Sequence, residues 1–266
     1  MIILYRKHFT LSLRLSLIAM LLLFPIVLSG CGMPQGAIDE NTPGLFNHYV
    51  VYPLSLTLQW IASIAHDNYG LAVIAMTIVI RLLLFPLMLK QYRSSLDMKS
   101  KMAGLQPELQ QLNIKYEGKN DSDAAMKRQQ ETMELYRKHD VNPFRIGCLP
   151  MLLQMPVLTG LYYALRMTPE LAEHPFLWFQ MGQPDSWLPL IVGCLYWFQF
   201  KVSSQQQQMP AGGAGGAVKG LAFIGYIFPV MMMVFAWNVP SAIALYWVVS
   251  AAFTIGQSLL FRRLFG

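Results

Sequence analysis

Long apolar runs separated by short polar segments dominate the chain, and one run sets the pattern for the rest. Residues 71–89 read LAVIAMTIVIRLLLFPLML, nineteen residues of nearly unbroken hydrocarbon. At about 1.5 Å per residue, a helix of this length crosses the hydrocarbon core of a bilayer, which is about 30 Å thick. The sequence therefore predicts a transmembrane helix, and we place this first span at 69–90.

Arg81 lies near the middle of this run. A guanidinium at mid-membrane costs about 2.5 to 3.5 kcal/mol, so its side chain should face protein or water rather than lipid. An ion pair inside a helix bundle is one explanation, but every Asp and Glu lies outside the predicted spans. We favour a polar cavity around Arg81 and keep the ion pair as the alternative.

Four further apolar runs predict spans at 143–166, 187–202, 220–237 and 239–261. The core of the third, residues 187–200, reaches only about 21 Å at the rise of an α-helix. Either flanking residues extend it or the bilayer thins there. The last two spans are joined so closely that they should pack as an antiparallel pair.

The only long polar region, residues 91–142, predicts an antiparallel helical hairpin with its turn at EGKNDSD. Apolar residues of its first arm alternate four and three apart, as in a heptad seam: Met98, Met102, Leu105, Leu109, Leu112 and Tyr116. Met126, Met133 and Tyr136 should line the second arm. Such a seam is usually core, although its methionines would also suit an adaptable binding surface. Pro107 predicts a bend or a local restart of the first arm.

Residues 1–30 have a basic start, an apolar run and a Leu-Ser-Gly end directly before Cys31. This pattern is typical of a bacterial lipoprotein signal peptide, with the thiol of Cys31 as the lipidation site. A plain transmembrane helix with an incidental cysteine is the alternative.

Residues 31–68 predict an extracellular linker followed by a helix in the outer interface, with Trp60 at headgroup depth. One face of that helix is apolar: Leu54, Leu58, Ile61 and Ala65. Another face carries polar side chains: Ser55, Gln59, Ser63 and His66.

The distribution of charge predicts the orientation. The region 90–145 holds eleven Lys or Arg against eight acids, whereas residues 32–70 hold no Lys or Arg. By the positive-inside rule the hairpin is cytoplasmic, as are the loop at 203–219 and the tail at 262–266, while 167–186 is an extracellular loop. The N-terminus is then outside and the C-terminus inside.

Composition excludes several classes of protein. The 266 residues are 55% hydrophobic and 13% charged, with a mean hydropathy of +0.39, which indicates a multi-pass membrane protein. The net charge of +6 comes from the basic start of the signal peptide and from the regions predicted to be cytoplasmic. We therefore expect no nucleic-acid binding. The three cysteines match no zinc or disulfide spacing. Because no Asp, Glu or His lies within a span, we expect no catalysis, no metal and no cofactor.

A small set of polar and aromatic residues in the spans could line a groove. A glutamine in such a helix more often joins helices than binds a ligand. The candidates are Arg81, Thr77, Gln154, Gln199, Trp247, Ser250 and Gln257.

Several strings together resemble the bacterial YidC membrane-protein insertases of the Oxa and Albino superfamily, from about residue 48 to 261. They are YGLAVIAMTIVIRLLLFPLMLKQ (69–91), LQPEL (105–109), LYRKHDVNPFRIGCLPMLLQMPVLTGLYYALR (135–166), FLWFQMGQPD (176–185) and FPVMMMVFAWNVPSAIALYWVVS (228–250). The Leu-Ser-Gly-Cys motif of the lipoprotein signal, called a lipobox, is similar to that of the family members of Gram-positive bacteria. The short segment between the signal and the first span is also similar to theirs. The sequence ends at Gly266, soon after the last span, whereas some family members have a long basic tail. The resemblance therefore does not predict that this chain docks on the ribosome through such a tail.

The resemblance implies an all-α integral membrane protein with five transmembrane helices around a hydrophilic groove. It assigns the groove arginine to Arg81, the amide of the second span to Gln154 and an aromatic position to Trp247. The implied function is insertion of nascent membrane proteins into the lipid bilayer of the bacterial plasma membrane, alone or with the Sec translocon. Two alternative functions are a transporter of a small solute or lipid and a structural assembly factor.

Overall fold

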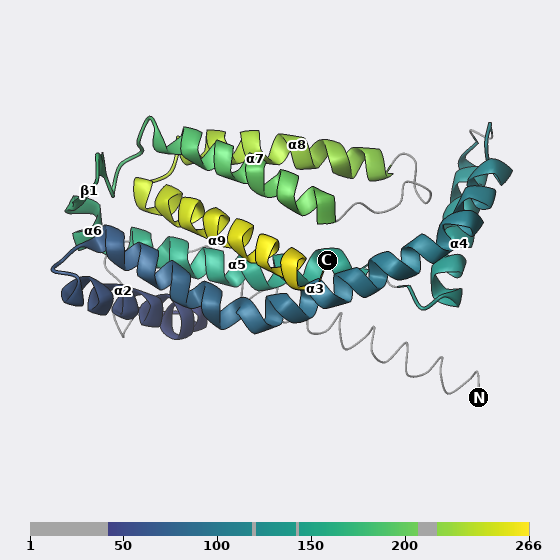
Figure 1. Cartoon of the computed structure of the whole chain (residues 1–266). Helices are drawn as coiled ribbons and strands as arrows, with labels where there is room; N and C mark the ends of the chain where they lie inside the picture. Colours follow the sequence, from purple (N-terminus) through teal and green to yellow (C-terminus); the bar gives the residue numbers. More distant parts are fainter. Residues whose placement is uncertain (1–41, 119–120, 142–143, 207–216, 266) are drawn as a thin grey trace.

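The protein is a bundle of long helices with a helical arm at one end (Figure 1). The computed structural model describes residues 42–118, 121–141, 144–206 and 217–265. The expected signal peptide and Cys31 lie outside the described residues. In chain order the elements are η2 (Asn47–Val51, a π-helix), α2 (Tyr52–Ile64), α3 (Tyr69–Lys115), α4 (Ser122–Lys138), α5 (Phe144–Arg166), α6 (Pro169–Glu173), β1 (Pro175–Phe176), β2 (Phe179–Gln180), α7 (Leu188–Gln206), α8 (Ala217–Ala236) and α9 (Ser241–Phe265).

α3 joins the first predicted span and the first hairpin arm in one helix of 47 residues. At its start, the Asn68 side chain accepts a hydrogen bond of 3.0 Å from the backbone N–H of Leu71, which caps the first turn. The helix does not restart at Pro107 but continues through it. Leu105 and Leu109 on either side are buried in the hairpin core, and this packing offsets the hydrogen bond that proline cannot donate.

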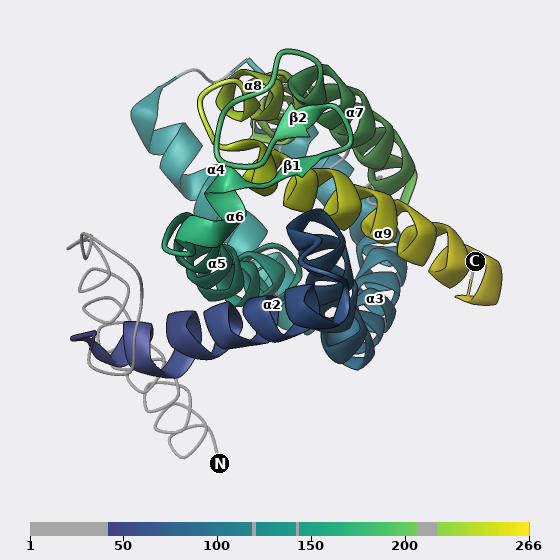
Figure 2. The ribbon, with the colours of Figure 1, turned by 90° about the vertical axis from the view of Figure 1, so that its left-hand side faces the viewer.

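α7 packs along both α8 and α9, so it separates the last two helices over most of their length (Figures 1 and 2). The antiparallel pairing expected for α8 and α9 is therefore replaced by a three-helix arrangement. Glycines explain the close approach of α7 to α8: a Cβ at Gly193 would press on Met233, and one at Gly225 would collide with Phe200. α7 continues to Gln206. Flanking residues therefore lengthen the third predicted span, whose apolar core at 187–200 is short.

On the other side of α9, α3 packs against it, and α2 lies across α3 and α5 (Figure 2). Ser55 of α2, predicted on the polar face of this helix, is buried, and its hydroxyl forms a hydrogen bond of 3.0 Å with the hydroxyl of Thr168. A hydroxyl without water needs such a partner. Trp60 points outward with 65% of its surface exposed, as a side chain at the membrane interface would.

Residues 167–186 form a compact cap on one end of the bundle, not merely a surface loop. β1 and β2 pair antiparallel, with Phe176 opposite Phe179. The cap buries Leu171, Phe176, Phe179 and Met181 in the main hydrophobic core. A backbone hydrogen bond of 3.0 Å from Ala242 to Met181 ties it to the first turn of α9. The bundle is thus tightly packed at the end opposite the hairpin.

The hairpin has a separate core built from the first-arm seam, with Met98, Met102, Leu105 and Leu109 buried. Across from them lie Leu135 and Tyr136 of α4. The expectation that Met126 and Met133 line this core is wrong: their side chains are 59% and 38% exposed. Tyr136 faces this core as predicted and does so together with Leu135, while the two methionines lie toward solvent.

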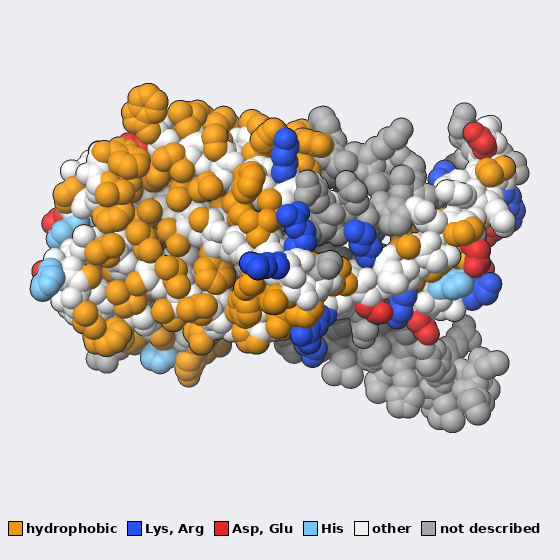
Figure 3. Space-filling view, viewed as in Figure 1, with side chains coloured by type: hydrophobic (Ala, Val, Ile, Leu, Met, Phe, Trp, Pro, Cys, Tyr) orange, Lys and Arg blue, Asp and Glu red, His pale blue; other side chains and the backbone are white. Residues whose placement is uncertain are grey.

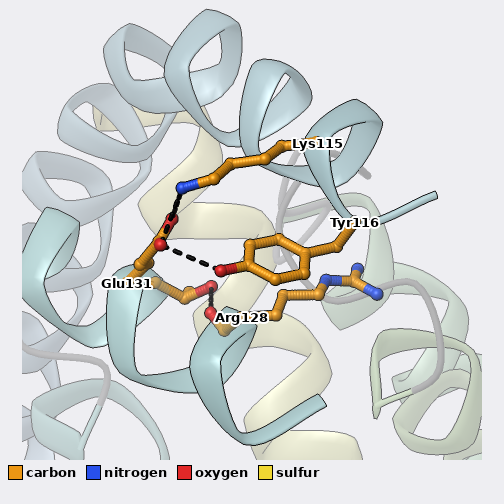
Figure 4. A network of polar contacts seen from close by, with 5 residues as sticks. Lys115, Tyr116, Arg128 and Glu131 are labelled. Carbon is orange, nitrogen blue, oxygen red and sulfur yellow. Dashed lines mark hydrogen bonds and ion pairs between the residues drawn. The ribbon is translucent and has the colours of Figure 1, made fainter. Parts of the chain in front are cut away.

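A polar network closes the tip of the hairpin (Figure 4). The Glu131 carboxylate accepts a hydrogen bond of 2.7 Å from Lys115 and one of 2.9 Å from the Tyr116 hydroxyl. Because this carboxylate favours their protonated forms, the pKa values of Lys115 and Tyr116 lie above their usual ones. Arg128 donates to the side chain of Asn113 at 2.6 Å. These contacts fix α4 against the end of α3.

On the face shown in Figure 3, apolar side chains cover the bundle and form what we call the apolar belt, whereas the hairpin carries many charged and polar side chains. Exposed residues of this belt include Leu83 on α3 and Val230 on α8, with 72% and 56% of their surfaces accessible. Contiguous apolar surface of this extent indicates contact with lipid. Among the described helices, α3 and α9 are long and apolar enough to cross a membrane, and Gly225–Ala236 of α8 is a shorter apolar stretch.

Candidate functional site

The predicted arginine lies between two helices inside the apolar belt. Arg81 is half-buried on α3, and its Nη2 donates a hydrogen bond to Oγ of Ser250 on α9. Ser250 is itself buried. The neighbouring residues Leu82 and Leu83 are exposed on the outer side of α3. Arg81 therefore points toward the protein and away from the lipid-facing surface, as its desolvation cost requires.

Thr77 lies one turn before Arg81 on α3 and is buried. Its hydroxyl donates at 2.6 Å to the carbonyl of Val73 in the same helix. This bond satisfies the hydroxyl within α3, so Thr77 lies close to the arginine in sequence but uses its donor for the helix backbone.

α9 carries a second polar contact one turn before Ser250. The side chain of Gln154 on α5 donates to the hydroxyl of Tyr246 at 2.9 Å, and Tyr246 is buried. Tyr246 and Ser250 are four residues apart, so they lie on one face of α9. This face of α9 therefore bonds Gln154 of α5 and Arg81 of α3 in adjacent turns.

Tyr196 of α7 completes the surroundings of this face. It is partly buried and packs against the main hydrophobic core, to which Tyr246 also belongs. Its ring packs edge-on against Phe228 of α8, with the centroids 5.8 Å apart. Neither Tyr196 nor Tyr246 is among the candidates predicted from the sequence. A tyrosine four residues before a candidate serine on one helix was the available signal for Tyr246.

The other three candidates are placed differently. Trp247 is half-buried and packs against the main core beside Tyr246. Gln199 on α7 and Gln257 on α9 each have one buried amide atom, Oε1 and Nε2 respectively, without a hydrogen-bond partner among the described residues. Leaving a buried polar atom unpaired costs about 1 to 3 kcal/mol. Such atoms are suited to a polar group from water or from a bound segment.

The chemistry available here is that of binding. Arg81 supplies a fixed positive charge, and the amides and hydroxyls supply donors and acceptors. The helical segments that flank Arg81, residues 71–96 of α3 and all of α5, α7 and α9, contain no Asp or Glu. Within the described residues, no group of three or more His, Cys, Asp or Glu is placed to hold a metal ion.

Comparison with known proteins gives a consistent result. The family model described as 60Kd inner membrane protein matches residues 60–265. The membrane protein insertase MisCA of Bacillus subtilis is 44% identical over 89% of this chain and 87% of its own length. The membrane protein insertase YidC 2 of Listeria innocua is 40% identical over 90% and 79%.

A third relative extends the match over nearly the whole of both chains. The membrane protein insertase YidC of Oceanobacillus iheyensis is 38% identical over 94% of this chain and 96% of its own length. The family model covers more than half of the chain, and these relatives match it nearly end to end. The chain therefore belongs to the 60Kd inner membrane protein family, which includes the YidC insertases.

Proposed function

We propose that this protein is a membrane protein insertase. It receives hydrophobic segments of nascent membrane proteins from the cytoplasm and releases them laterally into the bilayer. The observation that carries the proposal is Arg81, a cation held inside an apolar belt by a hydroxyl of α9 and flanked by helical segments without acidic residues. Its family relatives are insertases by name, which supports the same reading.

The proposed groove lies along the face of α9 that carries Tyr246 and Ser250, between α3, α5 and α7. Arg81, Thr77, Gln154, Gln199, Trp247, Ser250 and Gln257 are its candidate residues, and Tyr196 and Tyr246 join them. The cap residues pack into the core at one end of the bundle, which supports a groove closed on the side away from the hairpin. A client would then enter from the hairpin side.

Arg81 lowers the cost of bringing an acidic client segment out of water. A carboxylate in a medium of low dielectric is stabilised most where a cation is already fixed. The apolar part of the client can then move along the exposed flank of α3 into lipid. Burial of its apolar surface, worth about 25 cal/mol per Å², drives this step, so no nucleotide hydrolysis is needed.

The proposed topology has five spans, formed by α3 up to about residue 90, α5, α7, α8 and α9. Exposed cations Lys90, Arg93 and Lys201 lie at the hairpin side of the belt, and acidic Glu170 and Glu173 lie in the cap. By the positive-inside rule this asymmetry supports a cytoplasmic hairpin and an extracellular cap. A lipid anchor on Cys31 would be on the outer side, and cooperation with the Sec translocon fits the same orientation.

The test is insertion of a single-span client into liposomes that contain only the purified protein. Clients with an acidic or a neutral translocated tail are compared, and protease protection of the tail is the readout. Arg81→Ala should reduce insertion of the acidic client more than that of the neutral one, and Arg81→Lys should retain much activity. Arg137→Ala, which removes a cation from the hairpin, is the matched control.

The possible outcomes distinguish the roles of Arg81 and the alternative functions. Equal loss with Arg81→Ala and Arg81→Lys would show that the guanidinium is needed for packing rather than for charge. Insertion without any dependence on Arg81 would keep the insertase function and discard the proposed role of Arg81. If the wild-type protein supports no insertion at all, the insertase proposal fails and a transporter with Arg81 as its anion site becomes the better reading.

A further inference from the structure

A row of cations follows the edge of the apolar belt nearest the hairpin (Figure 3). We define the basic rim by its exposed side chains on three helices: Lys90 and Arg93 of α3, Lys201 of α7, and Arg262 and Arg263 of α9. The parts of these helices that contribute to the rim contain no Asp or Glu, from residue 71 to 96, 188 to 206 and 241 to 265. The rim is therefore strongly positive.

Two rim cations are held over aromatic rings. The guanidinium of Arg93 lies 4.7 Å from the centroid of Phe265, and Nζ of Lys201 lies 4.4 Å from the centroid of a Trp197 ring. Both rings are partly exposed at the margin of the belt. A cation supported by an aromatic ring keeps its charge at headgroup depth while its stem and the ring contact apolar chains.

The α3–α9 corner of the rim is rigidly built. Phe261 packs against both Phe85 and Tyr92, with centroids 5.2 Å apart in each pair. Tyr92 also contacts the ring of Phe265. The end of α9 is thereby fixed to α3 at the level where α3 leaves the belt and becomes the hairpin arm. The cations on both helices stay at the same level.

We infer that the basic rim binds the headgroups of anionic phospholipids. The argument is complementarity: a lipid offers a phosphodiester to the cations and an acyl chain to the apolar residues beside them. Leu260 and Leu264 on α9 are 45% and 60% exposed next to Arg262 and Arg263. A nucleic acid would pair with the cations but leave these leucines uncovered, so lipid is the partner that fits both features.

Bound lipid would also fix the depth of the bundle. Lys90 and Arg93 lie directly before the polar part of α3, and headgroups held there would set the point at which the hairpin emerges. This role is separate from insertion of clients, because it requires only the rim and the bilayer.

Native mass spectrometry of the full-length protein in detergent tests the inference. Equal amounts of dioleoyl phosphatidylglycerol and dioleoyl phosphatidylcholine are added, and the ratio of the two bound lipids is measured. The wild-type protein should retain mainly the anionic lipid. Replacing Lys201 and Arg263 by Gln should lower the ratio by about fivefold per cation, since each cation near an anionic surface contributes about that factor.

Matched variants separate the rim from overall charge. Lys127→Gln combined with Lys138→Gln removes the same charge from the exposed surface of the hairpin and should leave the ratio unchanged. Lys90→Gln combined with Arg262→Gln is a second rim variant and should lower it. An equal change in rim and hairpin variants, or no change in either, overturns the inference. Loss of cosedimentation with purified ribosomes in the rim variants, at an unchanged lipid ratio, would instead assign the rim to nucleic acid.

Discussion

Ser250 is the acceptor that fixes Arg81 to α9. Ser250→Ala would leave the guanidinium without this partner in an apolar setting, and a hydrogen bond to a charged group contributes about 1.5 to 3 kcal/mol. We therefore expect a lower midpoint of thermal unfolding in detergent and reduced insertion of acidic clients. The loss should be smaller than with Arg81→Ala, because the charge itself remains.

Thr254→Ala is the matched control on the same helix. Its hydroxyl donates at 2.8 Å to the carbonyl of Ser250 within α9, so its removal leaves Arg81 and its acceptor in place. If Ser250→Ala and Thr254→Ala behaved alike in both measurements, the contact between Arg81 and Ser250 would have no special role.

Asp185 caps the start of α7 in the segment outside the spans. Its carboxylate accepts hydrogen bonds from the backbone N–H groups of Trp187 at 2.8 Å and Leu188 at 2.6 Å. Although partial burial raises its pKa, these backbone donors outweigh burial and hold the pKa of Asp185 below its usual value. Asp185→Ala should cost about 1 kcal/mol, which is typical of an N-cap.

The sign of the pH dependence follows from this lowered pKa. The ionised cap stabilises the folded protein fully above the unfolded-state pKa, about 3.9, and the benefit is lost as pH falls through the lower folded-state pKa. The stability difference between wild type and Asp185→Ala should thus be constant near neutral pH and shrink below about pH 4. Glu173→Ala, an exposed acid of the same segment, is the control. A difference that grew on acidification would contradict the capping role.

The sequence supplied Arg81 and Ser250 as candidates, but not their pairing. An arginine in an apolar run is visible because its burial is costly, and the distance along the chain to Ser250 conceals the contact. Tyr246 was missed for the opposite reason. A tyrosine in an apolar span fits a core position by composition, and only the approach of Gln154 from α5 identifies its hydroxyl as a hydrogen-bond acceptor.

At the scale of elements, the hairpin has its own core and should lose structure locally. Leu105 is 1% exposed in that core. Leu105→Ala removes buried methylene groups and should cost about 2 to 5 kcal/mol. Hydrogen exchange measured by mass spectrometry should then become faster in α4 and in the second half of α3, with protection in α7 and α9 unchanged.

Met126→Ala tests the corrected register of α4. Because Met126 is largely exposed, this change should leave exchange in the hairpin as it is in the wild type. If Met126→Ala loosened the hairpin as much as Leu105→Ala, the packing of α4 through Leu135 and Tyr136 would be wrong.

The reason for the error on α4 is physical. Met126, Met133 and Tyr136 have the spacing of a seam, but α4 packs through Tyr136 and Leu135, which leaves the two methionines exposed. In the same way, hydropathy identified the long helices but not the cap, whose strands have two residues each. Its order comes from contacts with α9 that are distant in sequence.

At the scale of the whole molecule, the bundle and the hairpin each have their own hydrophobic cluster. The continuous helix α3 connects the two. It becomes the hairpin arm directly after Tyr92 and Arg93, which contact α9. The stability of the bundle should therefore not depend on the hairpin core. This separation makes it possible to ask what the hairpin contributes to function without unfolding the remainder.

We expect that replacing residues 95–138 by a short Gly-Ser linker weakens recruitment of clients while the bundle stays folded. The measurement is the cross-linking yield between an arrested nascent client and the protein, together with the thermal unfolding midpoint in detergent. The exposed Met126 and Met133 give a more limited test, because their replacement by Ser removes apolar contact surface and leaves the hairpin core intact. An unchanged cross-linking yield in the deletion would remove the hairpin from recruitment. A collapse of the unfolding transition would show that the bundle needs the hairpin after all, contrary to the two separate clusters.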